Sequence, residues 1–379
     1  MELPPLGLYI HLPWCERKCP YCDFNSHETE ALPETAYVDA LLTDLARDAQ
    51  LAGGRTVDSL FIGGGTPSLF SPEAIQRLFE GVAELVSLSP DLEATMEANP
   101  GSAEADRFSG YREAGINRLS LGIQSFDDAR LAALGRVHDS TQAHRAIEAA
   151  RGAGFDSFNI DLMHGLPGQS VEQGLADLAM AIECDPPHLS WYQLTIEPNT
   201  VFHKRPPLLP VEDTLADIQD GGEEMLALAG YSQYEVSAYS RAGRQCRHNL
   251  NYWAFGDYLA IGAGAHGKIT GVDGRIRRYA KTRAPQDYLD SAGRYTASEH
   301  WLDEQGRVAE FMLFALRLNA GFTLDTFEQR TGVPRVRVSA TIAQLLDEGL
   351  LEERAPAISA SALGRRFLDD VIARFLPDD

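Results

Sequence analysis

Short runs of aliphatic and β-branched residues alternate with longer, periodically apolar stretches through about residue 235. Runs of this length and composition are typical of buried strands. The predicted strands are Leu8–His11, Val57–Ile62, Leu92–Glu97, Asn117–Ile123, Ser157–Met163 and Leu189–Ile196. The predicted helices cover residues 33–52, 103–115, 139–152, 170–183 and 211–229, and a further helix begins at Ser71-Pro72-Glu73, a cap residue followed by Pro and an acid.

Six strand–helix units in series favour a parallel sheet. Because a full barrel needs eight units, the sequence predicts an α/β fold built on a partial (β/α)6 barrel. Chemistry in barrels takes place at the carboxyl ends of the strands. Polar or glycine-rich residues follow each predicted strand: a cysteine-rich loop, Gly63–Thr66, Asn99, Gln124, His164 and Glu197. We therefore expect these residues to converge on one site.

The pattern changes after the sixth unit. Residues 236–300 are rich in Tyr, Gly and Arg and have no clear strand–helix unit. From Glu310 a helical, leucine-rich pattern returns, followed by a short strand-like segment and a final helix near residues 361–375. We expect a barrel in residues 1–235, a connecting region in 236–300 and a mostly helical, winged-helix-like domain in 301–379.

Composition narrows the possible partners and compartment. The chain has 379 residues and a formal net charge of −22, which disfavours nucleic acid as a partner. Residues 301–379 also carry nine basic against thirteen acidic residues, so we expect this domain to pack or cover rather than to bind DNA. The first residues, MELPPLGLYI, lack the segments of a signal peptide, and no run is long enough for a membrane span. Five cysteines, an odd number, suit a reducing compartment, and we expect the cytoplasm.

Three of the five cysteines follow the first predicted strand. Cys15, Cys19 and Cys22 have the spacing C-x3-C-x2-C. Zinc could bind them together with His11 or His27, and a disulfide with a spare thiol is a further alternative. Zinc sites usually combine one C-x2-C pair with a second pair, and the sequence has no second pair. A [4Fe–4S] cluster held at three irons leaves the fourth iron open for an external ligand, and the spacing favours this interpretation.

With Tyr21 before its last cysteine, the loop resembles the signature of the radical S-adenosylmethionine superfamily. In that superfamily the amino and carboxylate groups of the methionine part bind the open iron, and reduction cleaves the sulfonium. Further motifs follow in order: YIHLPWC from Tyr9, GGGTP from Gly63, EANP from Glu97, GIQSF from Gly122, DLMHGLP from Asp161 and HNLNYW from His248. Over roughly residues 6–270 this ordered set resembles the oxygen-independent coproporphyrinogen III oxidase (HemN) group, and within it the HemW-type heme chaperones.

The resemblance implies contacts to S-adenosylmethionine. Gly64, Gly65 and Thr66 would contact its methionine part, because glycines permit close backbone approach. Glu97 would accept hydrogen bonds from the ribose hydroxyls. The other positions that the resemblance assigns to the cofactor are Tyr9, Tyr21, Gln124, Arg136 and Asp161. From the residues alone, an ordinary turn at the glycines, a surface acid at Glu97 and a surface salt bridge at Arg136 stay open.

The HNLNYW motif is associated in the HemW-type proteins with heme handling. Imidazole is a common axial ligand to heme iron, so His248 is a candidate heme contact, and Tyr252 and Trp253 offer flat apolar faces. From chemistry alone, a hydrogen-bonded loop histidine with core aromatics is the simpler interpretation. A basic run could pair with heme propionates or remain solvated: Arg275, Arg277, Arg278, Lys281 and Arg283.

Residues 262–267 read GAGAHG and formally fit the dinucleotide pattern G-x-G-x-x-G. Lys-Ile-Thr-Gly follows instead of a helix, and no early strand–helix–strand unit surrounds the segment, so the context argues against a dinucleotide site. We instead expect a tight backbone crossing near the mouth of the site.

Two departures from the oxidases favour the chaperone branch. The resemblance implies a further cysteine two residues after the third in true oxidases, but Asp23-Phe24 follow Cys22, and only fourteen residues precede Cys15 where the oxidases have a longer arm. We therefore expect a heme chaperone that binds a [4Fe–4S] cluster, S-adenosylmethionine and heme. It would deliver heme to an acceptor protein such as a respiratory enzyme. Decarboxylation of coproporphyrinogen III, a related radical methyltransferase and a structural zinc protein stay open, as does whether the chain is an enzyme at all.

Overall fold

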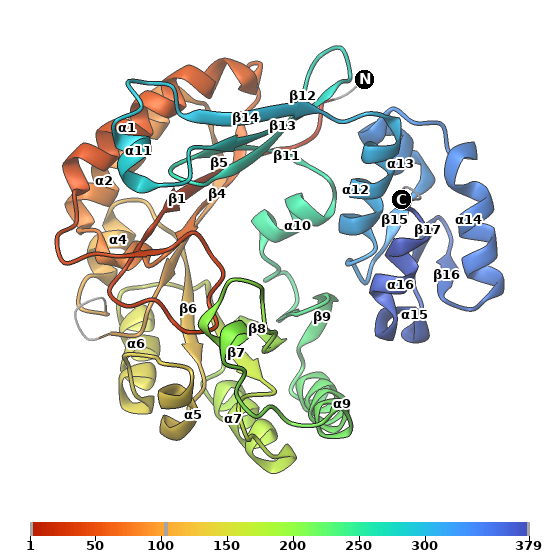
Figure 1. Cartoon of the computed structure of the whole chain (residues 1–379), viewed down its shortest axis with the longest axis horizontal. Coiled ribbons are helices and arrows are strands. Elements are labelled where there is room, and N and C mark those ends of the chain that lie inside the picture. Colours follow the sequence, from red (N-terminus) through yellow and green to blue (C-terminus); the bar gives the residue numbers. More distant parts are fainter. Residues whose placement is uncertain (1–2, 102–104, 377–379) are drawn as a thin grey trace.

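The computed structural model describes residues 3–101 and 105–376 (Figure 1). All six predicted strands are confirmed, and most extend a few residues beyond their predicted ends. They are β1 (Leu6–Leu12), β4 (Val57–Gly64), β5 (Leu88–Ala98), β6 (Arg118–Gln124), β7 (Phe158–His164) and β8 (His188–Gln193). Their neighbours in the sheet follow this same order, and every pair is parallel. The predicted partial α/β barrel is therefore confirmed.

The helices lie between these strands in sequence. They are α1 (Glu34–Asp48), α2 (Pro72–Leu85), α4 (Phe108–Glu113), α5 (Asp128–Ala133), α6 (Ser140–Gly152), α7 (Val171–Glu183), α8 (Val201–Lys204) and α9 (Glu212–Leu228). Ser71 caps α2 as predicted, since its hydroxyl accepts a hydrogen bond from the amide of Ala74 at 3.2 Å. The start of the predicted helix at 103–115 includes residues outside the described part. Helices α1, α2, α6 and α7 lie along the outside of the curved sheet, and their apolar faces form the main core with it (Figure 1).

The sheet continues beyond the six predicted strands. In the described residues it has twelve strands, in the order β14-β13-β12-β11-β1-β4-β5-β6-β7-β8-β10-β9. The additional strands are β9 (Ser232–Glu235), β10 (Ala238–Ser240), β11 (Asp257–Ile261), β12 (His266–Thr270), β13 (Ile276–Lys281) and β14 (Thr296–Trp301). Of these, β11 pairs in parallel with β1, and β12 to β14 extend that edge in antiparallel fashion. Two helices accompany them, α10 (Arg247–Trp253) and α11 (Pro285–Leu289).

Charged residues explain why the hydrophobic pattern did not predict the edge strands. Lys268 on β12 is buried, and its ammonium group lies 2.9 Å from the carboxylate of Asp257 on β11. Lys281 on β13 is buried between Asp44 and Asp48 of α1, at 2.6 and 2.7 Å. Because each charge is neutralised by a residue far away in sequence, burial of these strands is not visible in the local pattern.

The C-terminal residues form a second module beside the barrel (Figure 1). Its elements are α12 (Glu304–Ala315), β15 (Phe322–Thr323), α13 (Leu324–Thr331), α14 (Val336–Asp347), β16 (Leu351–Arg354), β17 (Ala357–Ala360), α15 (Ala362–Arg366) and α16 (Leu368–Ala373). The three strands form a separate small sheet in the order β15-β17-β16. A second hydrophobic core fills the module, and Phe255 and Ile276 from the barrel side join it. This mostly helical arrangement with a small antiparallel sheet confirms the predicted winged-helix-like fold.

The exact domain boundaries at residues 235/236 and 300/301 stay predictions. The first and last predicted domains include residues 1, 2 and 377–379, which lie outside the described part. Within that part, no helix combines the length and the apolar character needed to cross a bilayer.

Candidate functional site

The three-cysteine loop is anchored at the carboxyl end of β1. The chain continues from β1 into β2 (Trp14–Cys15), which pairs with β3 (His27–Glu28) and closes the loop between them. Cys15 is buried, whereas Cys19 and Cys22 are partly exposed, and none of the three forms a disulfide. All three line one cavity of about 370 Å³, which we call the cluster cavity. The three thiols therefore converge as predicted, and Gly64, Gly65, Thr66, Asn99 and Gln124 line the same cavity. His164 and Glu197, which were expected to join them, do not line it.

Each thiol has a polar neighbour that would stabilise its thiolate. The hydroxyl of Thr66 donates to Cys15 Sγ at 3.4 Å, and Arg136 Nη1 donates to Cys19 Sγ at 3.8 Å. Cys22 Sγ lies 3.6 Å from the hydroxyl of Ser26. Burial raises the pKa of the Cys15 and Cys22 thiols, so metal binding must displace their protons.

A single metal ion and an iron–sulfur cluster need different arrangements of their protein ligands. In residues 3–101 and 105–376, no group of three His, Cys, Asp or Glu side chains is arranged around one ion. A [4Fe–4S] cluster differs because each thiolate binds its own iron atom, so the thiols need only surround a common space. Three thiols around one cavity, with hydrogen-bond donors beside them, fit such a cluster.

The glycine-rich end of β4 packs tightly against this loop. A Cβ atom on Gly65 would lie 2.4 Å from the carbonyl oxygen of Trp14, so only glycine fits there. Gly64 has a φ of +123°, and a Cβ on it would meet the ring of His11 at 2.7 Å. The amide of Thr66 also donates to the carbonyl of Trp14 at 2.7 Å. These contacts hold the glycines against the segment that carries Cys15. An ordinary turn between a strand and a helix would not need such close packing on this segment.

Glu97, at the end of β5, points into the cluster cavity. One carboxylate oxygen accepts a hydrogen bond from the amide of Gly64 at 3.0 Å. Burial, followed by repulsion from Asp161, raises the pKa of Glu97 to about 7. A carboxylate in this position has free lone pairs toward the cavity, and its ionised form is energetically unfavourable without a partner. Such a group suits a ligand that supplies hydroxyl donors.

Arg136 and Asn99 connect two of the thiols. The Nη2 atom of Arg136 donates to Asn99 Oδ1 at 2.8 Å and to the carbonyl of Gly122 at 2.7 Å. Asn99 in turn donates to the hydroxyl of Thr66 at 3.0 Å. A chain of hydrogen bonds therefore runs from Cys19 through Arg136, Asn99 and Thr66 to Cys15. Arg136 therefore does not form the surface salt bridge that was the alternative, because its guanidinium faces the cavity.

Gln124 and Asp161 also line the cluster cavity. Gln124 has a φ of +69°, and its side-chain oxygen accepts from the hydroxyl of Tyr192 at 2.8 Å. Asp161 accepts from Ser120 at 3.0 Å and from Asn159 at 2.7 Å, and burial raises its pKa. These bonds fix the orientation of both side chains before any ligand binds.

The two predicted tyrosines lie in different places. Tyr21 lines the cluster cavity and packs on Phe202, with ring centroids 6.4 Å apart. Tyr9 lines a second cavity, and its hydroxyl is 2.9 Å from His11 Nδ1. Eleven of the thirteen predicted site residues therefore line the cluster cavity, and Tyr9 and His248 do not.

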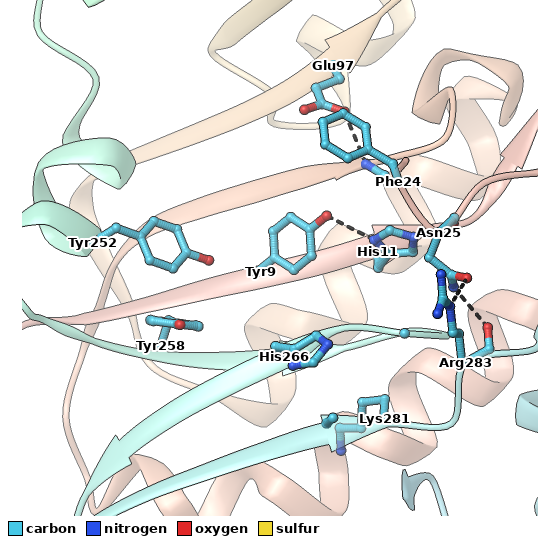
Figure 2. Close-up of a pocket in the computed structure, with 13 residues that line it drawn as sticks. Tyr9, His11, Phe24, Asn25, Glu97, Tyr252, Tyr258, His266, Lys281 and Arg283 are labelled. Carbon is cyan, nitrogen blue, oxygen red and sulfur yellow. Dashed lines mark hydrogen bonds between the residues drawn. The ribbon is translucent and has the colours of Figure 1, made fainter. Parts of the chain in front are cut away.

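The second cavity, which we call the tyrosine cavity, is shown in Figure 2, and it adjoins the first through lining residues that the two share. Its volume is about 680 Å³. Residues of β1, the cysteine loop, α10 and the β11–β13 edge line it: Tyr9, His11, Phe24, Asn25, Gly64, Glu97, Tyr252, Tyr258, Gly264, His266, Ala280, Lys281 and Arg283. Four residues belong to both cavities: Phe24, Gly64, Glu97 and Tyr252. A molecule in one cavity would thus share a wall with a molecule in the other.

His248 is buried, with 2% of its surface exposed, and lines neither cavity. Its Nδ1 is 3.1 Å from the hydroxyl of Ser59, and its ring stacks on Phe61 at 5.0 Å. Burial lowers the pKa of His248 to about 3. Helix α10 instead presents Tyr252 and Trp253 of the same motif to the cluster cavity. His248 as a heme contact stays a prediction, and this position makes it a core residue in the described conformation.

Several lining residues were missed by sequence reasoning. Asn99 was recognised only as a residue after a strand. His266 and Arg283 were noted only within the GAGAHG segment and the basic run. The predicted tight crossing was the available signal: Gly264 packs so closely on Asn25 that a Cβ would lie 2.4 Å from its amide nitrogen. This crossing brings β12 and the chain after β13 next to the cysteine loop.

Comparison with known proteins agrees with this geometry. The Radical SAM superfamily model matches residues 9–180, and the HemN C-terminal domain model matches residues 302–367. Heme chaperone HemW of Escherichia coli (strain K12) is 50% identical over 379 residues, and heme chaperone HemW of Haemophilus influenzae is 48% identical over 383 residues, each with full coverage of both chains. The structure of coproporphyrinogen III oxidase (HemN) from Escherichia coli, a radical SAM enzyme, matches with a TM-score of 0.83 at 25% identity, covering 98% of this chain and 90% of that one. This chain therefore belongs to the radical SAM superfamily and, within it, to the HemW family.

Proposed function

We propose that this chain is a heme chaperone, which binds heme beside a [4Fe–4S] cluster and S-adenosylmethionine and passes the heme to an acceptor protein. The full-length relatives named heme chaperone HemW support this proposal. The observation that carries it is the pair of adjoining cavities: one is lined by three thiols, and the other is larger, aromatic and contains none of those thiols. A site for the cofactor alone would not need the second cavity.

In this proposal the chain's own residues hold and orient the cofactors. Cys15, Cys19 and Cys22 would each bind an iron as thiolates, and the cluster would supply an electron and an open iron site to S-adenosylmethionine. Gly64, Gly65 and Thr66 would approach the methionine part through their backbone. Glu97 would accept the ribose hydroxyls, which supplies the donors that its buried carboxylate lacks. The same role of cofactor contact extends to Tyr21, Gln124, Arg136 and Asp161, and Tyr9 would act from the adjoining tyrosine cavity.

The acceptor would be a protein that uses heme, such as a respiratory enzyme. We place the chaperone in the cytoplasm. The five cysteines, none of which is paired in the described residues, suit a reducing compartment. The same compartment would keep the cluster thiols available for iron.

The test uses anaerobically reconstituted protein and hemin. We expect stoichiometric hemin binding with a defined Soret band. The heme should then pass to a heme-depleted respiratory heme protein, and the Soret band should follow it to that protein. Absence of hemin binding, or hemin that is never passed on, would contradict the proposal. Incubation with coproporphyrinogen III, S-adenosylmethionine and a reductant forms the second arm, because protoporphyrinogen formation would identify an oxidase instead.

A further inference from the structure

The basic run on the β13 edge contains one arginine that no carboxylate neutralises. Four of its five members are committed to acids within the protein: Arg275 to Asp273, Arg277 to Glu299, Arg278 to Glu310 and Lys281 to Asp44 and Asp48. Arg283 has no ion pair with a described residue. Its Nε donates to Asn25 Oδ1 at 3.2 Å, which leaves the terminal nitrogens of the guanidinium without a partner at the edge of the tyrosine cavity.

His266 is the second uncommitted group at this cavity. It lies at the start of β12, it is exposed, and no described residue makes a side-chain hydrogen bond with it. Burial and the charges of Arg278 and Arg283 lower its pKa, so the imidazole is neutral at pH 7 and one nitrogen carries a free lone pair. His11 differs, since Tyr9 and the carbonyl of Asn25 occupy both of its ring nitrogens at 2.9 Å.

The remaining lining is aromatic. Tyr9, Tyr252 and Tyr258 lie around the same space as His266, and Phe24 closes it toward Glu97 (Figure 2). The rings of Tyr252 and Tyr258 meet edge to face with centroids 4.3 Å apart, so the two side chains pack against each other on this wall. The cavity therefore combines flat apolar surfaces, one free imidazole and one free guanidinium.

We propose that the tyrosine cavity is the heme-binding site, with His266 as an axial ligand to the iron and Arg283 as the partner of a propionate. The inference deepens the proposed function and rests on it. Neutral imidazole is the common axial ligand of heme iron, and a guanidinium is the preferred partner of a carboxylate. Aromatic side chains cover the faces of the macrocycle. His248, the histidine of the HNLNYW motif, supports this wall from within the core: its ring packs against Tyr252 with centroids 4.8 Å apart.

This location sets heme directly beside the cofactor. Phe24 lies two residues after Cys22, and Phe24, Glu97 and Tyr252 line both cavities. Occupation of the cluster cavity therefore fixes part of the wall that heme contacts. Through that wall, assembly of the cluster would alter the affinity for heme.

The test is a hemin titration of the full chain, monitored by the Soret band and by electron paramagnetic resonance of the ferric iron. His266→Ala is expected to abolish the histidine-ligated signal and to weaken binding by about tenfold or more. His266→Cys keeps a ligand at this position, so its spectrum should change to that of thiolate ligation. His203→Ala removes an exposed histidine on α8 that lines neither cavity, and it serves as the matched control.

Arg283→Gln is expected to weaken hemin binding by about two- to fivefold, as for an exposed ion pair, and to leave the ligand signal unchanged. Arg275→Gln, at an exposed arginine already paired with Asp273, should have no effect. Unchanged spectra and affinity in both His266 variants, or loss of the ligand signal only in His248→Ala, would overturn this site and leave the chaperone function standing. A wild-type chain that binds no hemin would instead overturn the proposed function itself.

Discussion

Replacing Glu97 by Gln removes the charge of a partly buried carboxylate and nearly preserves its shape. The pKa of Glu97 is raised from the ordinary 4.5 to about 7, first by burial and then by Asp161. A carboxyl group whose folded pKa is raised stabilises the folded protein less as pH rises from its unfolded pKa, and the loss is complete above its folded pKa. Wild-type protein should therefore lose stability relative to Glu97→Gln between pH 4.5 and about 7.

The size of the effect follows from the pKa. From pH 5.5 to 7 the window spans about 1.5 units, which at 1.36 kcal/mol per unit gives about 2 kcal/mol. Unfolding entropy of about 2.1 cal/mol/K per residue, over 379 residues, gives about 0.8 kcal/mol/K. The Tm advantage of Glu97→Gln over wild type should thus grow by about 2–3 °C between pH 5.5 and pH 8.

The assay is thermal unfolding of metal-free wild type and variant at both pH values. Glu84→Gln, at an exposed glutamate on α2, is the control, and its Tm difference from wild type should not depend on pH. The same substitution should weaken cofactor binding. The side-chain amide of Gln keeps only one acceptor oxygen, so Glu97→Gln should bind S-adenosylmethionine about tenfold more weakly than wild type or worse. An equal Tm difference at pH 5.5 and pH 8 would mean that the fold does not raise the pKa of Glu97.

Three further predictions concern the same framework. Gly65→Ala should abolish iron incorporation, measured as iron per chain, because its Cβ would collide with the carbonyl of Trp14, whereas Gly152→Ala, with open space around it, should incorporate normally. Lys281→Met leaves the buried Asp44 and the partly exposed Asp48 without their cation and should cost about 3–5 kcal/mol in chemical denaturation, and a loss smaller than 1 kcal/mol would contradict the importance of these ion pairs. Thr66→Val removes the hydrogen bond to the first cysteine and should lower the cluster's reduction potential in a redox titration, and an unchanged potential would argue against that bond.

The sequence predicted the parts of the fold that depend on local pattern. The six strands of the barrel, the cap at Ser71 and the small C-terminal module follow from hydrophobic periodicity and turn chemistry. The β11–β14 edge does not, because Lys268 and Lys281 are buried only through acids on other elements. The local sequence pattern could not show that these lysines are paired, because their acidic partners come close only in the folded chain.

The local sequence likewise predicted one part of the candidate site and not the other. The cysteine spacing and the residues after the first four predicted strands identified the cluster cavity, because parallel strands end at one edge, whereas His164 and Glu197 after the last two do not line it. The tyrosine cavity depends on the crossing of Gly264 over Asn25, which brings distant segments together. The sequence contains five basic residues in one run, and only the ion pairs of the folded chain single out Arg283. Likewise, burial of His248 is a property of packing against Ser59 and Phe61.

The most direct test of the cluster with an open iron is electron paramagnetic resonance of the reduced, anaerobically reconstituted protein with and without S-adenosylmethionine. We expect about four iron and four sulfide per chain and a cluster signal that shifts when the nucleotide is added. Cys15→Ala, Cys19→Ala and Cys22→Ala should each lose the signal. Zinc in place of iron, or a cluster signal that does not respond to S-adenosylmethionine, would contradict the account.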